Sequence, residues 1–197
     1  SGGLVKIPAS STEKDSIYHI PKELSFLEDT DAREYLEAMK MVQKYAELNR
    51  KIMSRRIAGF LGLDYEKLEK FTSVHNYYNF EDEIIRKGAI SAKEGEKVII
   101  PLNMRDGSIL ATGKGNKEWN YSAPHGAGRL MSRGEAKGKI SLEEFRKSMK
   151  GVFSTSVKNS TIDEAPMAYK TPESIMIYLE ETVEILEIIK PLYNFKA

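Results

Sequence analysis

The stretch "KVIIPLNMRDGSILATG", residues 97–113, decides the fold of this chain. Two apolar runs, "KVIIPLN" and "SILATG", stand on either side of residues that include Asp106 and Gly107, which are typical of turns. A third run, "EIIRKGAISA", precedes them at residues 83–92. Short runs rich in β-branched residues and bounded by turn residues favour strands. The sequence therefore predicts a β-rich region over residues 84–113.

The segment before this region has a helical pattern. Asp31 followed by Glu34 is typical of a capping box, and apolar residues then recur at helical spacing as far as Phe60. The spacing predicts a long helix over residues 31–60 and a short helix that ends near residue 71. The following segment "TSVHNYYNF", residues 72–80, is β-branched and aromatic, which predicts a strand.

The last third of the chain contains two further helix starts. Ser141 with Glu144 has the capping-box spacing, and Thr171 precedes a proline at a first helical position. The final helix is predicted to end before Pro191 and to bury the stripe Ile175, Leu179, Val183 and Leu186. Together these patterns predict an α+β fold: a long N-terminal helix and a C-terminal helix packed on a mixed, mostly antiparallel sheet.

Composition excludes several classes of protein. The chain has 197 residues, 41% of them hydrophobic, which is enough for one substantial domain. Lys and Arg number 30 against 29 Asp and Glu, so any site for a polyanion must be local. Cysteine is absent, which excludes disulfides and thiolate chemistry and fits a reducing compartment. No apolar run has the length of a membrane span, and we expect a cytoplasmic protein without a membrane partner.

The segment "SAPHGAGRLMSR", residues 122–133, contains the strongest candidate for chemistry. His125 follows a proline and precedes glycines, which would let backbone amides approach a phosphate closely. Arg129 and Arg133 could bind phosphate oxygens, and a neutral imidazole could attack an electrophilic phosphorus atom. The alternative is a glycine-rich turn with a capping histidine and two surface arginines.

The other candidates are weaker. His19 lies in the irregular first 30 residues and is interpreted as structural or incidental. His75 is either a strand histidine that bonds a backbone carbonyl or a ligand of a divalent metal ion. Asp163 and Glu164 in "IDEAPMAYK" are predicted to be solvated acids before a turn.

A set of motifs resembles the RtcB family of GTP- and manganese-dependent RNA-splicing ligases. The resemblance runs from about Tyr35 to the last residue. It is carried by "VHNYYNF", "IIRKGAISA", "VIIPLNMRDGSILATGKGN", "SAPHGAGRLMSR", "IDEAPMAYK" and "IIKPLYNFKA", in this order. It implies that residues 31–197 are the C-terminal portion of an RtcB-like catalytic domain. Residues 1–30 would be a linker or the cut edge of a missing N-terminal half.

The resemblance also implies roles for individual residues. His125 would attack the α-phosphate of GTP and hold GMP, and His75 would bind Mn²⁺. Arg129 and Arg133 would bind phosphate or RNA ends. The positions expected beside the nucleotide are Asn103, Ser108, Ala127, Gly128, Tyr169 and Lys196. Of these, Asn103 departs from the family pattern, in which a serine is expected.

The implied reaction joins an RNA 3′-phosphate, or a 2′,3′-cyclic phosphate, to a 5′-hydroxyl, in tRNA splicing or in RNA repair. The remaining metal ligands of the family have no counterpart in this sequence. We therefore expect the polypeptide to be inactive without the missing N-terminal half. Two alternatives stay open: a noncatalytic nucleotide- or RNA-binding module, and a nucleotidyltransferase that caps RNA ends without sealing them.

Overall fold

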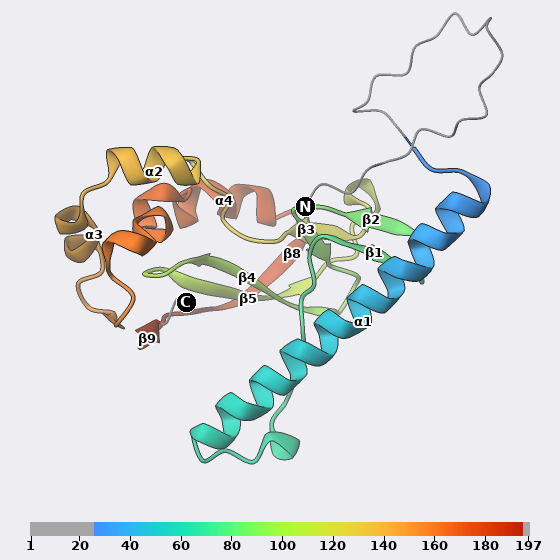
Figure 1. The fold of residues 1–197 in the computed structure, drawn as a ribbon, viewed down its shortest axis with the longest axis horizontal. Helices are drawn as coiled ribbons and strands as arrows, with labels where there is room; N and C mark the ends of the chain where they lie inside the picture. Colours follow the sequence, from blue (N-terminus) through green and yellow to red (C-terminus); the bar gives the residue numbers. More distant parts are fainter. Residues whose placement is uncertain (1–25, 195–197) are drawn as a thin grey trace, which may run out of the picture. The chain divides into compact units, whose positions relative to one another are not determined.

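The computed structural model describes residues 26–194, and the chain divides into two compact units, Ser1–Glu66 and Lys67–Ala197. The predicted α+β class is confirmed: Figure 1 shows a long N-terminal helix, small antiparallel sheets and a C-terminal helix. His19 and Lys196 lie outside the described residues, as does most of the predicted linker. Within residues 26–194, no helix combines the length and the apolar character that a membrane span requires.

The first unit is dominated by helix α1, Asp29–Phe60. The helix starts two residues before the predicted Asp31. Its N-cap is Glu28, whose side chain makes no capping hydrogen bond, so the predicted capping box of Asp31 and Glu34 is wrong. The local geometry of the first turn, rather than the residue pattern, sets this boundary.

The predicted second helix over residues 63–71 is also wrong, because only the short 3-10 turn η2, Tyr65–Lys67, forms there. Gly62 adopts φ +72°, a left-handed conformation that ends α1. The amide of Leu63 then donates back to the carbonyl of Ala58 at 2.9 Å. Within this unit, Arg55 lies 2.5 Å from Glu66 and closes the turn onto the end of α1.

The second unit is built on a three-stranded antiparallel sheet in the order β4-β5-β8. Strand β4 is Lys97–Asn103 and β5 is Gly107–Gly113, as residues 97–113 predict. The side-chain oxygen of Asn103 accepts hydrogen bonds from the amides of Arg105 and Asp106 at 3.0 and 2.9 Å. These bonds form the tight turn of the hairpin, and β5 becomes the central strand.

The predicted C-terminal helix is only partly correct. Helix α4 spans Pro172–Leu179 and then ends, and Val183–Ile189 forms strand β8 along β5. Val183 is buried, but Leu186, which was predicted to be buried with it, is half exposed. The segment "VEILEII" is rich in β-branched residues, and it pairs with the edge of β5 along its length, with one register shift between Leu110 and Ala111.

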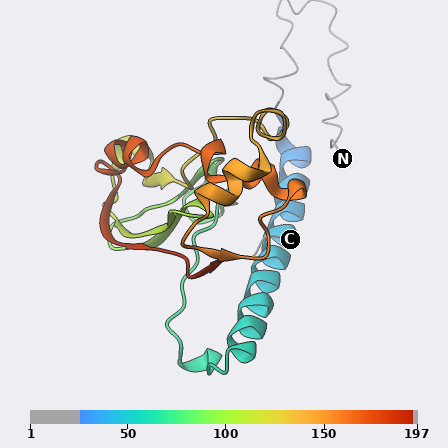
Figure 2. The ribbon, with the colours of Figure 1, turned by 90° about the vertical axis from the view of Figure 1, so that its left-hand side faces the viewer.

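Three short strand pairs surround this sheet. Strand β1, Tyr77–Asn79, pairs with β2, Ile84–Arg86, and β3, Ala89–Ser91, pairs with β6, Ser122–Pro124, both antiparallel. Figure 2 shows the parallel pair of β7, Phe153–Ser154, and β9, Tyr193–Asn194. The strand predicted over residues 72–80 is therefore reduced to 77–79, and His75 lies before it.

Short helices form the rest of the second unit. Helix α3, Leu142–Ser148, starts with the predicted capping box of Ser141 and Glu144. Helix α2, Arg133–Lys139, starts with a second capping box, Ser132 with Glu135, where no helix was predicted. The 3-10 turns are η3, Lys117–Trp119; η4, Asn159–Glu164; and η5, Pro166–Ala168.

Two buried clusters hold the second unit together. One packs apolar residues of the sheet, such as Ile100 and Ile109, against Leu179 of α4. The other packs Phe145 of α3 against α2 and the turns η4 and η5, and it includes Met104 from the β4–β5 turn. Tyr169 contacts both clusters. The segment around Tyr169 is therefore where the sheet and the helical cluster meet.

Candidate functional site

The glycine-rich loop that carries His125 is attached to the edge of the sheet. After β6, the amide of Ala127 donates to the carbonyl of Pro101 on β4 at 3.1 Å. A Cβ atom on Gly126 would lie only 3.0 Å from the same carbonyl oxygen, so this approach favours glycine. Three residues on, the amide of Leu130 donates to the carbonyl of Ala168 at 2.9 Å. The loop is thus held at both ends by backbone hydrogen bonds.

A hydrogen bond to a backbone carbonyl fixes the imidazole of His125. Nδ1 of His125 lies 2.7 Å from the carbonyl oxygen of Gly88. A carbonyl oxygen only accepts, so Nδ1 must carry the proton, and in the neutral ring Nε2 keeps its lone pair. His125 lines two pockets and is not sealed in the apolar core. This hydrogen bond therefore leaves the lone pair of Nε2 without a partner among the described residues.

Two neighbours support this arrangement. The side-chain oxygen of Asn76 accepts the amide hydrogen of Gly88 at 2.9 Å, which anchors the residue whose carbonyl bonds His125. Asn76 itself has φ +56°, a left-handed conformation that asparagine tolerates better than most residues. The ring of His75 stacks on the ring of His125, with centroids 4.8 Å apart and an interplanar angle of 22°. Sequence reasoning did not find the contact between Asn76 and Gly88.

Backbone amides of the loop remain available to an anion. In residues 26–194, no protein acceptor takes the amide hydrogens of Gly126 and Gly128, whereas the amide of Ala127 is used by Pro101. Gly128 has φ +73°, which favours glycine. Of the two predicted backbone positions, Ala127 and Gly128, only Gly128 therefore keeps an amide for an anion, and Gly126 adds a second one.

A pocket of about 720 Å³ opens on one side of the loop and is here named the Ser108 pocket. Its volume lies within the range of small-molecule sites. Eight of the ten predicted site residues line it, which brings together β4, β5, the loop and the segment after η5. These residues are Asn103, Ser108, His125, Ala127, Gly128, Arg129, Arg133 and Tyr169. His75 is not among its lining residues, and Lys196 lies outside the described part of the chain.

Asn103 lines this pocket, but its side chain is committed to the hairpin turn. Its amide nitrogen donates to Asp106 at 2.7 Å, and its oxygen accepts the two turn amides described above. In this conformation the direct nucleotide contact predicted for Asn103 would compete with the turn. The residue instead shapes the pocket through the β4–β5 connection.

The two arginines of the motif have protein partners. Arg129 donates to the carbonyl of Met131 at 3.0 Å, to the hydroxyl of Tyr169 at 3.0 Å and to the carbonyl of Asp163. Arg133 donates to Asp163 at 2.5 Å and to Glu164 at 2.6 Å. Both side chains still line the Ser108 pocket. Their guanidinium groups are therefore oriented by the protein before any ligand binds.

The prediction that Asp163 and Glu164 are solvated is wrong. Their exposed fractions are 5% and 6%, because η4 turns both carboxylates inward toward Arg133. Glu164 also accepts from the hydroxyl of Tyr169 at 2.5 Å. Burial, together with this hydrogen bond, raises the pKa of Tyr169 to about 12. The hydroxyl of Tyr169 is thus a neutral and fixed donor to Glu164.

The described residues do not by themselves fit a manganese ion. Across residues 26–194, no group of three or more metal-ligating side chains lies close together. His75 offers a single imidazole, and a stable site needs several ligands, usually with anionic ones among them. Its place beside His125 is nevertheless compatible with one ligand of a larger site.

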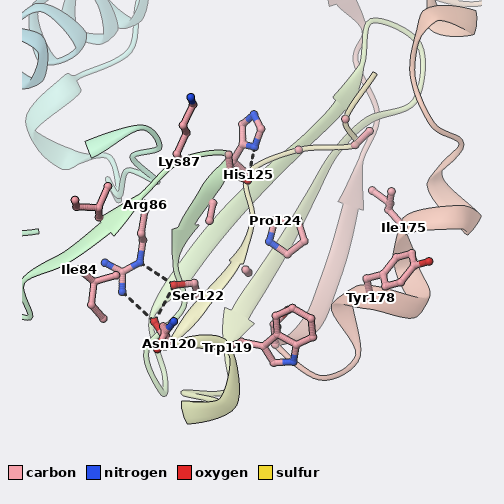
Figure 3. A pocket seen from close by; sticks show the side chains of 18 of the residues that line it. Ile84, Arg86, Lys87, Trp119, Asn120, Ser122, Pro124, His125, Ile175 and Tyr178 are labelled. Carbon is pink, nitrogen blue, oxygen red and sulfur yellow. Dashed lines mark hydrogen bonds between the residues drawn. The ribbon is translucent and has the colours of Figure 1, made fainter. Parts of the chain in front are cut away.

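A second pocket, of about 600 Å³, lies on the other side of the loop and is here named the Trp119 pocket (Figure 3). It shares His125, Gly126, Ala127 and Gly128 with the Ser108 pocket. In Figure 3, His125 and Lys87 lie at one end, and Trp119 and Tyr178 at the other. Sequence reasoning missed this pocket, although Trp119 is the single tryptophan of the chain.

The fold and the loop together define an α+β domain built around one oriented histidine that stands between two pockets. Comparison with known proteins shows the family of this domain. The profile described as tRNA-splicing ligase RtcB matches residues 6–197. The chain belongs to the RtcB family.

Several curated relatives agree with this assignment. The chain is 34% identical over 188 residues to RNA-splicing ligase RtcB1 of Escherichia coli ATCC 25922. The alignment covers 87% of this chain and 46% of that protein. RNA-splicing ligase RtcB of E. coli K12 gives the same identity and coverage. The tRNA-splicing ligase RtcB of Nanoarchaeum equitans is 28% identical over 206 residues, covering 83% of this chain and 42% of that protein. The chain thus spans about half the length of these relatives.

Proposed function

We propose that this chain supplies the nucleotidyl-transfer portion of an RNA ligase, with His125 as the nucleophile that accepts GMP from GTP. The observation that carries the proposal is the hydrogen bond from Nδ1 of His125 to the carbonyl of Gly88. It directs the lone pair to Nε2, the nitrogen that a phosphorus atom would meet. As the ring becomes cationic during attack, the same carbonyl dipole stabilises the growing charge.

In the proposed first step, Nε2 of His125 forms a bond to the α-phosphorus of GTP. The bond from that phosphorus to the bridging oxygen breaks, and pyrophosphate leaves with the electron pair. The product is a phosphoramidate between the imidazole and GMP. The amides of Gly126 and Gly128, which are free of protein acceptors in residues 26–194, are placed to bind phosphate oxygens during this step.

The Ser108 pocket is the proposed site of the guanine nucleotide. It adjoins His125, has the volume of a nucleotide site and contains the hydroxyl of Ser108. Arg133 lies at its rim with a largely exposed side chain, so it can bind phosphate oxygens while its partners hold it in place. Tyr169 adds an aromatic wall.

In the proposed later steps, an RNA 3′-phosphate oxygen attacks the phosphorus held by His125, and the phosphorus–nitrogen bond breaks. The RNA 5′-hydroxyl then attacks the activated 3′-phosphate and releases GMP. The names of the relatives, RNA-splicing ligase and tRNA-splicing ligase, support RNA as the substrate. A 2′,3′-cyclic phosphate would need hydrolysis first. We propose that His75 is one ligand of a manganese ion. The remaining ligands would come from other residues.

The decisive experiment measures covalent labelling of His125. The chain is incubated with GTP labelled at the α-phosphate, with manganese and with single-stranded RNA. A second arm uses E. coli RtcB in which the matched 188-residue region is replaced by this chain, so that the rest of the relative is supplied. We expect acid-labile label in this second arm and none in its His125→Ala variant. The proposal is wrong if unmodified E. coli RtcB is labelled and the hybrid, shown to be folded, is not.

The same experiment separates the two alternatives. A noncatalytic nucleotide- or RNA-binding module would bind GTP or RNA without acquiring label. A capping nucleotidyltransferase would acquire label and transfer GMP to an RNA 3′-phosphate, but it would not join that RNA to a 5′-hydroxyl end. Sealed RNA, measured by gel electrophoresis, therefore distinguishes the ligase from both.

A further inference from the structure

We propose that the Trp119 pocket binds the 3′ end of a single-stranded RNA, with the terminal phosphate at His125 and upstream bases near Trp119 and Tyr178. This inference rests on the proposed function, because it assigns the acceptor that takes GMP from His125. The Ser108 pocket is proposed for the nucleotide donor. Among the cavities of the described residues, the Trp119 pocket is the other one that is lined by the His125 loop.

The position of the pocket fits a second reactant. Two-substrate transfer requires both reacting groups to reach one atom in a defined geometry. The loop from His125 to Gly128 forms a wall of both pockets. A phosphate at the His125 end of the Trp119 pocket would therefore lie next to the loop that carries the proposed GMP intermediate.

The charge of the pocket fits a polyanion. Lys87 and Lys170 line it with exposed side chains, and none of the described lining residues is acidic. This is unusual in a chain with 29 acidic residues. Arg86 also lines the pocket, but it is buried and bonded to Asp82 at 3.2 Å, so it is largely neutralised. The two lysines are the charges that remain for phosphates.

The aromatic residues fit unpaired bases. Trp119 is 50% exposed, and its indole nitrogen donates to Glu181 at 2.7 Å, which fixes the plane of the ring. Tyr178 of α4 is 64% exposed. Sites for single-stranded nucleic acid combine such rings, on which bases stack, with cations that follow the backbone. An apolar small molecule would explain the rings but not the lysines.

The backbone path between Trp119 and His125 sets an upper limit on the distance between the two ends of the pocket. Six residue steps separate Trp119 from His125, and an extended chain rises about 3.3 Å per residue, so the two lie at most about 20 Å apart. Residues Asn120 and Tyr121 have positive φ angles and shorten this path. A strand of a few nucleotides can place its terminal phosphate at one end and a base at the other.

The single tryptophan gives a direct test with the whole chain. Its fluorescence is followed while a short single-stranded RNA with a 3′-phosphate is added without GTP. We expect saturable quenching by base stacking, and weaker binding for the same RNA with a 3′-hydroxyl. Absence of quenching, or equal quenching by inorganic polyphosphate, overturns the proposal.

Matched variants locate the binding. Tyr178→Ala should weaken it about tenfold, whereas Ile177→Ala, on the same helix, 70% exposed and outside the pocket, should change it less than about twofold. The pair Lys87→Ala and Lys170→Ala should weaken binding and flatten its salt dependence. Two exposed lysines of equal charge outside the pocket, Lys147 and Lys150, serve as the control pair. Equal losses of RNA affinity in the variants and in their controls would contradict binding of RNA in the Trp119 pocket.

The two proposals fail in different ways. RNA quenching without GMP label on His125 in the hybrid with E. coli RtcB would remove the ligase mechanism and keep the RNA site. Label on His125 with no RNA effect on Trp119 would keep the mechanism and remove the assigned acceptor pocket.

Discussion

The carbonyl oxygen of Gly88 lies 2.7 Å from Nδ1 of His125 and 3.3 Å from the backbone nitrogen of the same residue. One peptide group therefore holds both the ring and the main chain of the histidine. Asn76 in turn accepts the amide hydrogen of Gly88 at 2.9 Å, which holds the preceding peptide group, so Gly88 is anchored on both sides of its Cα atom. The orientation of Nε2 is thus a property of the fold.

This relationship predicts the tautomer of His125. With the ring neutral, the proton should reside on Nδ1, because the carbonyl of Gly88 can only accept. Long-range ¹H–¹⁵N spectra of the chain labelled at its three histidines distinguish the two ring nitrogens. The spectrum of His125→Ala assigns the signal. An unprotonated Nδ1 in the neutral ring would contradict the hydrogen bond.

Replacing Asn76 should loosen Gly88, the residue whose carbonyl bonds His125. Asn76→Gly accepts the left-handed backbone without strain but removes the acceptor for the Gly88 amide, whereas Asn76→Asp keeps an acceptor oxygen. Loss of one hydrogen bond of about 1 kcal/mol should lower labelling of His125 about fivefold in the glycine variant. Hydrogen exchange at the amide of Gly88 should accelerate in the same variant. Similar behaviour of the two variants would argue against a positioning role.

Removing the guanidinium of Arg133 should destabilise the second unit. Asp163 and Glu164 are buried and share Arg133, so Arg133→Ala leaves two carboxylates facing each other with fewer donors. We expect a loss of about 2 kcal/mol in the free energy of unfolding, measured by urea denaturation. Arg146→Ala, on the exposed surface of α3, is the matched control and should change it little. A loss confined to RNA or nucleotide binding would assign Arg133 a purely functional role.

The capping box of α2 should make stability depend on pH. Hydrogen bonds from the backbone and side chain of Ser132, with Lys139 nearby, lower the pKa of Glu135 from 4.5 to about 2. A lowered pKa in the folded state means that this contribution is fully present above about pH 4.5 and is lost as the pH falls toward 2. The wild-type chain should therefore melt above Glu135→Gln near neutral pH, and the difference should vanish near pH 2.

Thermal unfolding followed by circular dichroism checks this pH dependence. Glu143→Gln is the control, because Glu143 also lies in a first helical turn but is not the capping residue of α3. A difference between wild type and Glu135→Gln that stays constant from neutral pH to acid would contradict the role of the box.

The strands around residues 97–113 could be predicted because β-branched runs and the Asp106–Gly107 turn are local signals. Strand β8 could not be predicted, because its apolar residues also fit a helical stripe. It is a strand because it pairs with the edge of β5. Helix α2 could have been found, since Ser132 and Glu135 have the capping-box spacing, but the surrounding glycines obscured it. Local patterns thus succeeded where no distant partner decides the conformation.

The candidate site shows the same division. His125, Ser108 and Tyr169 could be named from motifs, and the structure brings them to one pocket. The burial of Asp163 could not be predicted, because it depends on Arg133, thirty residues away along the chain. The bond between Asn76 and Gly88 likewise joins residues twelve positions apart. Such tertiary contacts leave no periodic trace in the sequence.

The Ser108 pocket draws its walls from distant parts of the chain, with β4 and β5 on one side and Ile189, Pro191 and Asn194 on the other. A ribosome synthesises the first group long before the second, so a nascent chain that has just released the hairpin has only half of this pocket. Ligand capture must then wait until residues 189–194 emerge. If the pocket binds a nucleotide as proposed, a nucleotide added during translation should protect the late chain from proteolysis but not the early intermediate.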